Sequence, residues 1–168
     1  MGDNFTAIFE NKKNTNDFFS LPETIKTSNE FYSLRELTCC KDWKWMCEED
    51  EVNNEMNVFG CVTMIGPCDI DITFGLQLIE VSHNTRWKEF IECEPMRLWL
   101  RQLCFSLSPV FGFPIYTSEY TQSTDFVIEG KNYNELLTHL TNNYGSIGTH
   151  ISKDNFNYAY LERFEDKG

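Results

Sequence analysis

A chain of 168 residues that is 41% hydrophobic and 24% charged has the composition of a folded domain and not of a disordered segment. Its 26 acidic residues against 14 Lys and Arg give a net charge of −12. That excess disfavours binding to nucleic acid or to an anionic membrane, because both depend on cationic side chains. We also expect no membrane span, since no apolar run in the sequence is long enough.

The N-terminal 27 residues are rich in Asn, Lys and Thr, and we expect them to be largely irregular. After them, Phe31, Leu34 and Leu37 have the spacing of an amphipathic helix over 28–40, and Ser28 can cap its N-terminus. We expect the acid-rich segment that follows, Cys47–Asn57, to be a loop or a solvated helix end.

The strongest strand signal lies in Val58–Ile65 and Ile70–Val81, which are rich in β-branched and aromatic residues. Gly66-Pro67 between them indicates a tight connection, so the pattern predicts a β-hairpin over about 58–81. Alternation in the second strand predicts a core face, made of Ile70, Ile72, Phe74, Leu76 and Leu78. It also predicts a polar face, made of Asp69, Asp71, Thr73 and Gln77.

Helical spacing of large apolar residues continues through Asn84–Ser108. Pro95 marks either the first turn of a second helix or a kink in one long helix, and Pro109 is expected to end it. Residues 110–118 are then expected to be extended or looped.

The last part of the chain contains three further elements. Asp125–Glu129 reads as a short strand, Tyr133–Tyr144 as an amphipathic helix closed by Gly145, and the alternation over 156–161 as a terminal strand. Strands and helices mix without regular alternation. We therefore predict a single α+β domain, with an antiparallel sheet around the hairpin packed against two or three amphipathic helices.

Cysteine usage points to a reducing compartment. The count is odd, and we expect free, mostly buried thiols and a cytoplasmic protein. No pair has the spacing of a zinc site, so we expect no metal and no cofactor. The seven residues are Cys39, Cys40, Cys47, Cys61, Cys68, Cys93 and Cys104.

No catalytic signature accompanies the three histidines, His83, His139 and His150. We expect His83 in an exposed turn and His139 on the flank of its helix. The Gly145–Thr149 stretch lacks the Lys of a nucleotide-binding loop and reads as a helix stop and turn. The sequence therefore predicts no catalytic residue.

The remaining signal is the clustering of acidic and aromatic residues expected at the surface, and it predicts a partner-binding site. Acidic side chains close in sequence to the polar hairpin face could pair with Lys or Arg of a partner, while large aromatic rings beside them anchor it. The predicted residues are Trp43, Trp45, Glu48, Glu49, Asp50, Glu51, Glu55, Asp69 and Asp71.

In its small size, acidity, single domain and lack of catalytic motifs, the chain resembles the immunity proteins that bacteria pair with polymorphic or contact-delivered toxins. The resemblance implies a cytoplasmic inhibitor that occludes the active site of a basic toxin, such as a nuclease. It implies a protein partner, with no direct contact to nucleic acid or membrane, and it leaves a homodimer open. It assigns no role to any individual residue.

Three alternatives stay open at this point. A DNA-mimicking counter-defence protein would have the same acidic surface. An enzyme or small-molecule-binding domain would have an aromatic pocket containing His83 or His150. A structural subunit would have a large apolar interface and no use for its acids.

Overall fold

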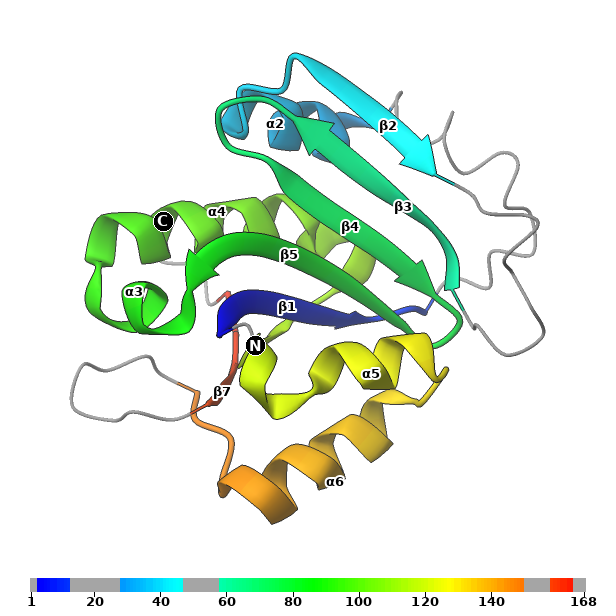
Figure 1. The fold of residues 1–168 in the computed structure, drawn as a ribbon, viewed down its shortest axis with the longest axis vertical. Coiled ribbons are helices and arrows are strands. Elements are labelled where there is room, and N and C mark those ends of the chain that lie inside the picture. Colours follow the sequence, from blue (N-terminus) through cyan, green and yellow to red (C-terminus); the bar gives the residue numbers. More distant parts are fainter. Residues whose placement is uncertain (1–2, 13–27, 47–57, 150–157, 165–168) are drawn as a thin grey trace.

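Figure 1 shows a computed structural model of the chain, which describes residues 3–12, 28–46, 58–149 and 158–164. Within these residues, seven strands pair into one antiparallel sheet. The strands are β1 (Asn4–Glu10), β2 (Asp42–Met46), β3 (Val58–Ile65), β4 (Ile70–Gly75), β5 (Leu78–Arg86), β6 (Ile115–Ser118) and β7 (Ala159–Leu161). Their order across the sheet is β2-β3-β4-β5-β1-β6-β7, which places the first strand of the chain between two later ones.

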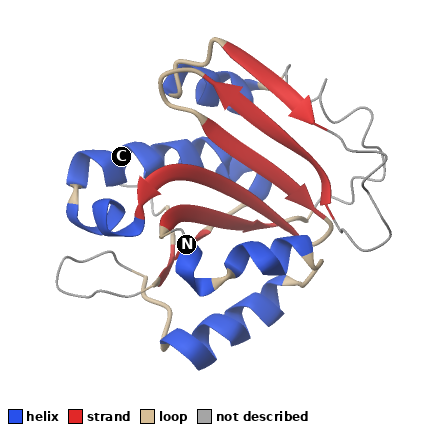
Figure 2. Ribbon diagram, in the orientation of Figure 1, coloured by secondary structure: helices blue, strands red, loops and turns tan. Residues whose placement is uncertain are grey.

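Helices cover the two faces of the sheet unequally (Figure 2). They are α2 (Asn29–Leu37), α3 (Trp87–Glu92), α4 (Glu94–Phe111), α5 (Ser123–Ile128) and α6 (Tyr133–Tyr144), with a 3-10 turn, η1, at Glu119–Thr121. α2, α3 and α4 pack on one face, whereas α5 and α6 pack on part of the other. The arrangement confirms the predicted α+β class, with an antiparallel sheet packed against amphipathic helices.

The larger core lies between the sheet and α2, α3 and α4. One row of register partners crosses six strands on this face and is buried throughout: Val62, Ile72, Val81, Ala7, Tyr116 and Tyr160. Aromatic rings join the row to the helices, for example Phe5 and Phe90 with centroids 4.7 Å apart. Burial of each large apolar side chain contributes about 1.5–3 kcal/mol, so this face holds most of the hydrophobic stabilisation.

A smaller core forms where α5 and α6 cross the opposite face. Its buried members are Ile8, Leu78, Ile115, Val127, Leu136, Leu140 and Ala159. These come from β5, β1, β6, β7 and the two helices, and none of the described residues of β2, β3 or β4 is among them. The helices leave part of this face uncovered on β2–β5. We call this part the open face.

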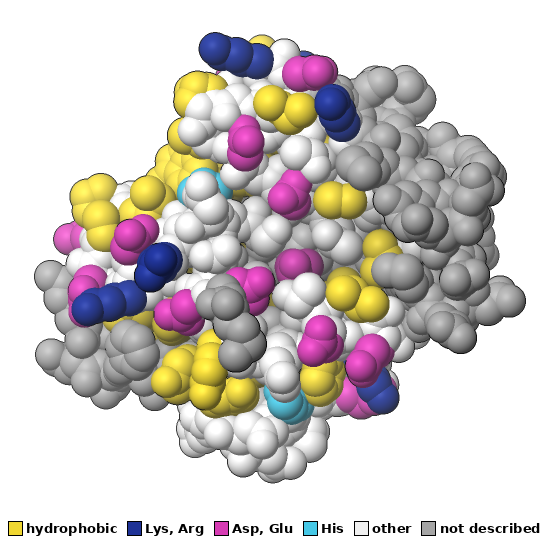
Figure 3. Space-filling model, viewed as in Figure 1, with side chains coloured by type: hydrophobic (Ala, Val, Ile, Leu, Met, Phe, Trp, Pro, Cys, Tyr) yellow, Lys and Arg dark blue, Asp and Glu magenta, His cyan; other side chains and the backbone are white. Residues whose placement is uncertain are grey.

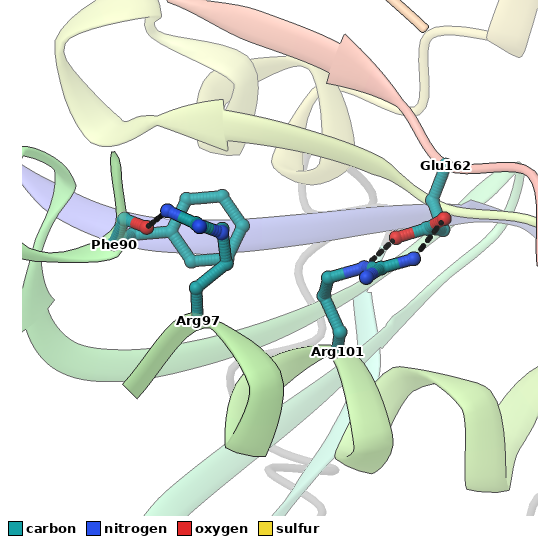
Figure 4. Close-up of polar contacts among 4 residues, drawn as sticks. All are labelled: Phe90, Arg97, Arg101 and Glu162. Carbon is teal, nitrogen blue, oxygen red and sulfur yellow. Dashed lines mark hydrogen bonds and ion pairs between the residues drawn. The ribbon is translucent and has the colours of Figure 1, made fainter. Parts of the chain in front are cut away.

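Two arginines one turn apart tie α4 to its neighbours (Figure 4). Arg97 donates from a guanidinium nitrogen to the Ile91 carbonyl oxygen at 2.5 Å, near the end of α3, with the Phe90 carbonyl at 3.5 Å. Arg101 donates two hydrogen bonds to Glu162, at 2.5 and 3.0 Å. This bidentate pair fastens the chain after β7 to the middle of α4.

The predicted hairpin second strand is in fact two strands. β4 ends at Gly75 and β5 begins at Leu78. The two residues between them, Leu76 and Gln77, form a solvent-exposed turn. A Cβ on Gly75 would lie 2.7 Å from the Leu78 carbonyl oxygen, so the tight turn needs glycine at this point. Because the turn breaks the alternation, Leu76 is 44% exposed and Leu78 joins the smaller core instead of the larger one.

The expectation of an irregular N-terminal segment is wrong for Asn4–Glu10, which forms β1. Both faces of this strand are covered, so apolar residues run through it without the alternation of a half-buried strand. Residues 13–27 lie outside the described residues.

Two further predictions in the second half need correction. Pro109 does not end α4, which continues to Phe111. The proline leaves the Phe105 carbonyl without its usual backbone donor, and the Ser108 hydroxyl donates to that oxygen at 2.8 Å instead. Gly112, with φ of 80°, ends the helix. Pro95 lies in the first turn of α4, so the first of the two readings of this proline is correct.

The predicted strand at Asp125–Glu129 is a helix, α5. Its buried residues Ser123 and Val127 are four positions apart, as a helix requires, and packing against the sheet outweighs the local β-propensity. Three local predictions are confirmed: Ser28 caps α2, Gly145 closes α6, and β7 forms within the described part of 156–161. The predicted helical stretch from Asn84 begins only at Trp87, because β5 continues to Arg86.

Candidate partner-binding site

A polar row runs across the sheet on the side that includes the open face. Successive register partners are Lys44, Thr63, Asp71, Ser82, Thr6 and Thr117. Cross-strand partners project from the same face of a sheet, so these side chains form one line over β2, β3, β4, β5, β1 and β6. The line is polar from end to end, in contrast to the apolar row behind it.

A second row on the same side changes character along its length. It begins with Cys61, Thr73 and Glu80 and continues with Ile8, Ile115 and Leu161. The apolar members lie where α5 and α6 cover the sheet. Glu80 is therefore the last polar residue before the smaller core, at the boundary of the open face.

A hollow of about 380 Å³ lies on this face, over β4, β5 and β1. It is lined by Asn4, Thr6, Asp69, Asp71, Glu80, Ser82, His83, Asn84, Glu119 and Thr124. Four of these residues are acidic, and among the described lining residues none is Lys or Arg. Asp69, Asp71 and Asn84 are exposed, so the hollow opens to solvent. In Figure 3, several acidic side chains lie near the centre of this view, and others lie toward its edges together with Lys and Arg.

Glu80 is the buried acid of the hollow, with 5% of its surface exposed. Burial, together with the nearby charges of Glu119, Asp125 and Asp71, raises the pKa of its carboxyl group to about 7. The Thr124 hydroxyl opposes the rise by donating to Oε2 at 2.6 Å. Near neutral pH this carboxyl group therefore exchanges a proton readily and carries a partial negative charge.

Each of the other acids of the hollow accepts a hydrogen bond from the fold. Thr63 Oγ1 donates to Asp71 at 2.6 Å, across the β3–β4 pair. Asp69 accepts from the Gly66 amide at 2.6 Å and so closes the β3–β4 turn. Glu119 accepts from the Asn4 amide at 3.4 Å. The carboxylates are thus positioned by the fold before any ligand arrives.

A hydroxyl network lies below the hollow and joins α5 to the sheet. Thr6 Oγ1 lies 2.5 Å from Thr117 Oγ1, which lies 2.7 Å from Ser123 Oγ. All three side chains are buried, and a buried hydroxyl is costly unless it is hydrogen-bonded. Because they satisfy one another, they form a rigid polar floor beside Glu80.

His83 is half-buried on β5 and not in the exposed turn that was predicted. The Thr85 amide donates to its Nδ1 at 3.1 Å, which leaves the proton of the neutral ring on Nε2. Its ring packs edge-on against Trp99, with centroids 5.2 Å apart. Burial lowers its pKa, with Asp69 opposing the shift. These contacts give His83 a structural role in the wall of the hollow.

Two of the described cysteines are poor candidates for a catalytic nucleophile. Burial raises the pKa of the Cys61 and Cys104 thiols, which is the opposite of what a thiolate nucleophile needs. His139, on the flank of α6 as predicted, hydrogen-bonds through Nε2 to the Thr121 carbonyl at 2.8 Å. His150 lies outside the described residues.

The cysteines that the structure describes are all free, as expected, but only Cys104 is fully buried, and Cys39 and Cys93 are exposed. Within the described ranges, no cluster of three or more His, Cys, Asp or Glu side chains is placed to hold a metal ion. None of the helices in the described part of the chain is both long and apolar enough to cross a lipid bilayer.

The structure brings together only part of the predicted site. Asp69 and Asp71 meet at the hollow. The register places Trp43 and Trp45 opposite the core residues Met64 and Val62, and the side chains of the two tryptophans are not described. Glu48, Glu49, Asp50, Glu51 and Glu55 lie outside the described residues.

Sequence reasoning missed Glu80 and Glu119. The signal for Glu80 was present, since a charged residue interrupts the apolar run Leu78-Ile79-Glu80-Val81. Glu119 lies in η1 and had no local signal. It reaches the hollow only because β6 pairs with β1, which brings residues 115 positions apart into contact.

A second, more apolar hollow of about 690 Å³ is lined by residues that pack on both cores. Its lining includes Phe111, Phe113, Tyr133 and Phe164, with charged residues around them. It contains no histidine among its described residues, so it differs from the histidine-containing aromatic pocket that an enzyme was expected to have. His83 lies instead in the acidic hollow.

Comparison with protein families, with curated protein sequences and with solved structures found no match to this chain.

Proposed function

We propose that this chain is a non-catalytic acidic binding protein that docks a basic protein on the open face of its sheet. The observation that carries the proposal is the hollow itself, where Asp69, Asp71, Glu80 and Glu119 converge without a Lys or Arg among the described lining residues. Four carboxylates left without a cation at one place create a strong local field. A cationic side chain of a partner relieves that repulsion when it enters.

The physical consequences favour a protein partner over a small cation. A net charge of −12 steers a basic protein toward the molecule and raises its rate of encounter. Charge pairs that become desolvated in an interface have coupling energies of about 1.5–7 kcal/mol in measured cases. The polar row extends beyond the hollow over several strands, which offers a partner a surface wider than one side chain.

We propose further that binding inhibits the partner, in the manner of the immunity proteins that the sequence resembles. A toxin that cleaves nucleic acid needs a basic surface around its active site. An acidic protein that covers this surface blocks access to the substrate without chemistry of its own. The same surface on a DNA-mimicking protein would act similarly, and the identity of the captured partner separates the two.

The test is the binding of a basic partner by charge-matched variants. The full chain is used to capture proteins from the source cell at low salt, and the affinity of the purified partner is measured by calorimetry at 50 and 300 mM NaCl. We expect the double variant Asp71→Asn, Glu119→Gln to weaken binding at least tenfold at 50 mM. We also expect wild-type affinity to fall steeply with salt.

The control variant, Glu89→Gln, Glu92→Gln, removes the same charge from exposed positions on α3, outside the hollow. It should change the affinity by less than threefold. Equal losses in the two variants would show that total charge acts and the hollow does not, which would contradict the proposal. Inhibition is then scored as loss of the partner's activity on addition of one equivalent of the chain.

A further inference from the structure

Three tyrosine rings form a cluster on the protein surface beside the acidic hollow. Tyr120 in η1, Tyr144 at the end of α6 and Tyr158 just before β7 come from separate parts of the chain. Their ring centroids are 5.5 Å apart for Tyr120–Tyr158, 5.4 Å for Tyr144–Tyr158 and 6.3 Å for Tyr120–Tyr144. We call these three residues the tyrosine cluster.

The tyrosine cluster is held in position from behind. The Tyr144 hydroxyl donates to the Tyr120 carbonyl at 3.4 Å, and His139 fixes the next residue of η1 through its bond to the Thr121 carbonyl. The His139 ring also contacts Tyr144, with centroids 6.1 Å apart, and Phe126 at 4.6 Å. The rings therefore need little ordering when a ligand binds, which lowers the entropic cost of binding.

The exposure of Tyr120 within the tyrosine cluster is not explained by stability. Tyr120 is 58% exposed, and an aromatic ring gains stability when it is buried. Rigid, exposed tyrosines are typical of the residues that dominate binding energy at protein interfaces. Figure 3 shows hydrophobic and acidic side chains next to one another on this face of the molecule.

The tyrosine cluster and the hollow share the short element η1. Glu119 lines the hollow, and the next residue, Tyr120, belongs to the cluster. The Ser118 hydroxyl holds the start of η1, since it accepts from the Tyr120 amide at 3.1 Å and donates to the carboxylate of Asp3. A cation attracted by the carboxylates of the hollow is thus drawn to the part of the surface where the next residue after Glu119 is an exposed aromatic ring.

We propose that the tyrosine cluster is a second subsite of the docking surface and receives an arginine side chain of the basic partner, stacked on Tyr120. The inference rests on the proposed function. A planar guanidinium stacks on an aromatic face and keeps donors free for a carboxylate such as Glu119, which a lysine ammonium cannot do in the same way.

The test uses the full chain and a hexa-arginine peptide, with binding measured by calorimetry at low salt. Cation–π interactions of the expected strength correspond to an effect of about threefold to thirtyfold. We expect Tyr120→Leu, which keeps apolar area but lacks the ring, to weaken binding within that range. Tyr120→Phe keeps the ring and should remain within twofold of wild type. Circular dichroism and thermal unfolding verify that each variant is folded.

A matched control exists on the opposite face. Tyr32 on α2 is 60% exposed, so Tyr32→Leu removes a tyrosine of equal exposure away from the hollow. It should leave the affinity for hexa-arginine unchanged. The Tyr120→Leu substitution should reduce the affinity for a hexa-lysine peptide less than it reduces the affinity for hexa-arginine.

The outcomes separate this inference from the proposed function. If hexa-arginine binding falls in Asp71→Asn, Glu119→Gln but is the same in Tyr120→Leu as in wild type, the tyrosine subsite is refuted and the acidic docking face stands. If neither variant differs from its control, both are refuted. Equal losses in Tyr120→Leu and Tyr32→Leu also overturn the subsite.

Discussion

Glu80 lies where the polar and apolar parts of one sheet face meet, and its environment couples folding to pH. Its raised pKa means that the folded chain holds this proton more tightly than the unfolded chain, whose value is 4.5. The contribution to stability is therefore complete below pH 4.5 and is lost as the pH rises through about 7. Above that pH the fold retains a buried charge next to other carboxylates.

The variant Glu80→Gln should accordingly stabilise the protein at alkaline pH. The amide can still accept from Thr124, but it carries no charge to bury. We compare the free energy of unfolding of the variant with that of wild type at each pH. The variant's advantage at pH 8 should be larger than its advantage at pH 4.5 by up to about 3 kcal/mol. Urea denaturation at the two pH values measures this difference. A gain that is the same at both would contradict the assigned pKa.

Single residues of the hollow also show which positions can be predicted from the sequence and which cannot. Asp69 and Asp71 could be assigned to one polar face because strand alternation is a local rule. Glu119 could not, because the partnership of β6 with β1 is set by the packing of both cores and not by any pattern near residue 119. Local strand alternation thus places Asp69 and Asp71 in the hollow, whereas long-range strand pairing places Glu119 there.

Elements with strong periodicity were predicted well, and short elements were not. α6 has a capping box, in which Asn132 and Glu135 exchange hydrogen bonds, and a clear apolar stripe that ends at a glycine. α5 has only six residues, so its helical spacing cannot outweigh the β-branched residues in its sequence. β1 was missed because both of its faces are covered. Local sequence patterns fail to predict the secondary structure wherever tertiary contacts determine it.

The link between α4 and the chain after β7 gives a prediction at this scale. Arg101→Ala leaves Glu162, which is 7% exposed, without the partner that both of its carboxylate oxygens bind. We expect a loss of about 1–3 kcal/mol, reduced from the value of a fully buried pair because the Arg101 side chain is 38% exposed.

The exposed pair Lys131–Glu135 on α6, at 3.8 Å, provides the comparison. Lys131→Ala should cost no more than about 0.5 kcal/mol, since surface ion pairs contribute little. Thermal and urea unfolding of the two variants measure both values. If Arg101→Ala were as mild as Lys131→Ala, the bidentate pair would not fasten this end of the sheet.

For the whole molecule, proton binding and cation binding draw on the same negative field. A cation in the hollow lowers the pKa of Glu80, so it binds more tightly when that carboxyl group is already ionised. The charges of Glu119, Asp125 and Asp71 contribute to this field at Glu80. His83 loses its proton at lower pH, because burial lowers its pKa.

The affinity for hexa-arginine should therefore rise between pH 6 and pH 8, by up to about tenfold. In Glu80→Gln most of this rise should disappear. Calorimetry at constant ionic strength measures it, and experiments in two buffers of different ionisation enthalpy detect the proton that is released. A wild-type affinity that is flat over this range would show that Glu80 does not sense the ligand.

The polar row across the sheet also has a consequence for how the surface can vary. Asp71 projects from β4 between Ile70 and Ile72, which are buried in the larger core on the other side of the same strand. Substitution at every second position of β3 and β4 therefore alters the exposed chemistry while the residues that hold the fold stay the same. Under the proposed docking mode, specificity and foldability would thus depend on residues on different sides of the sheet.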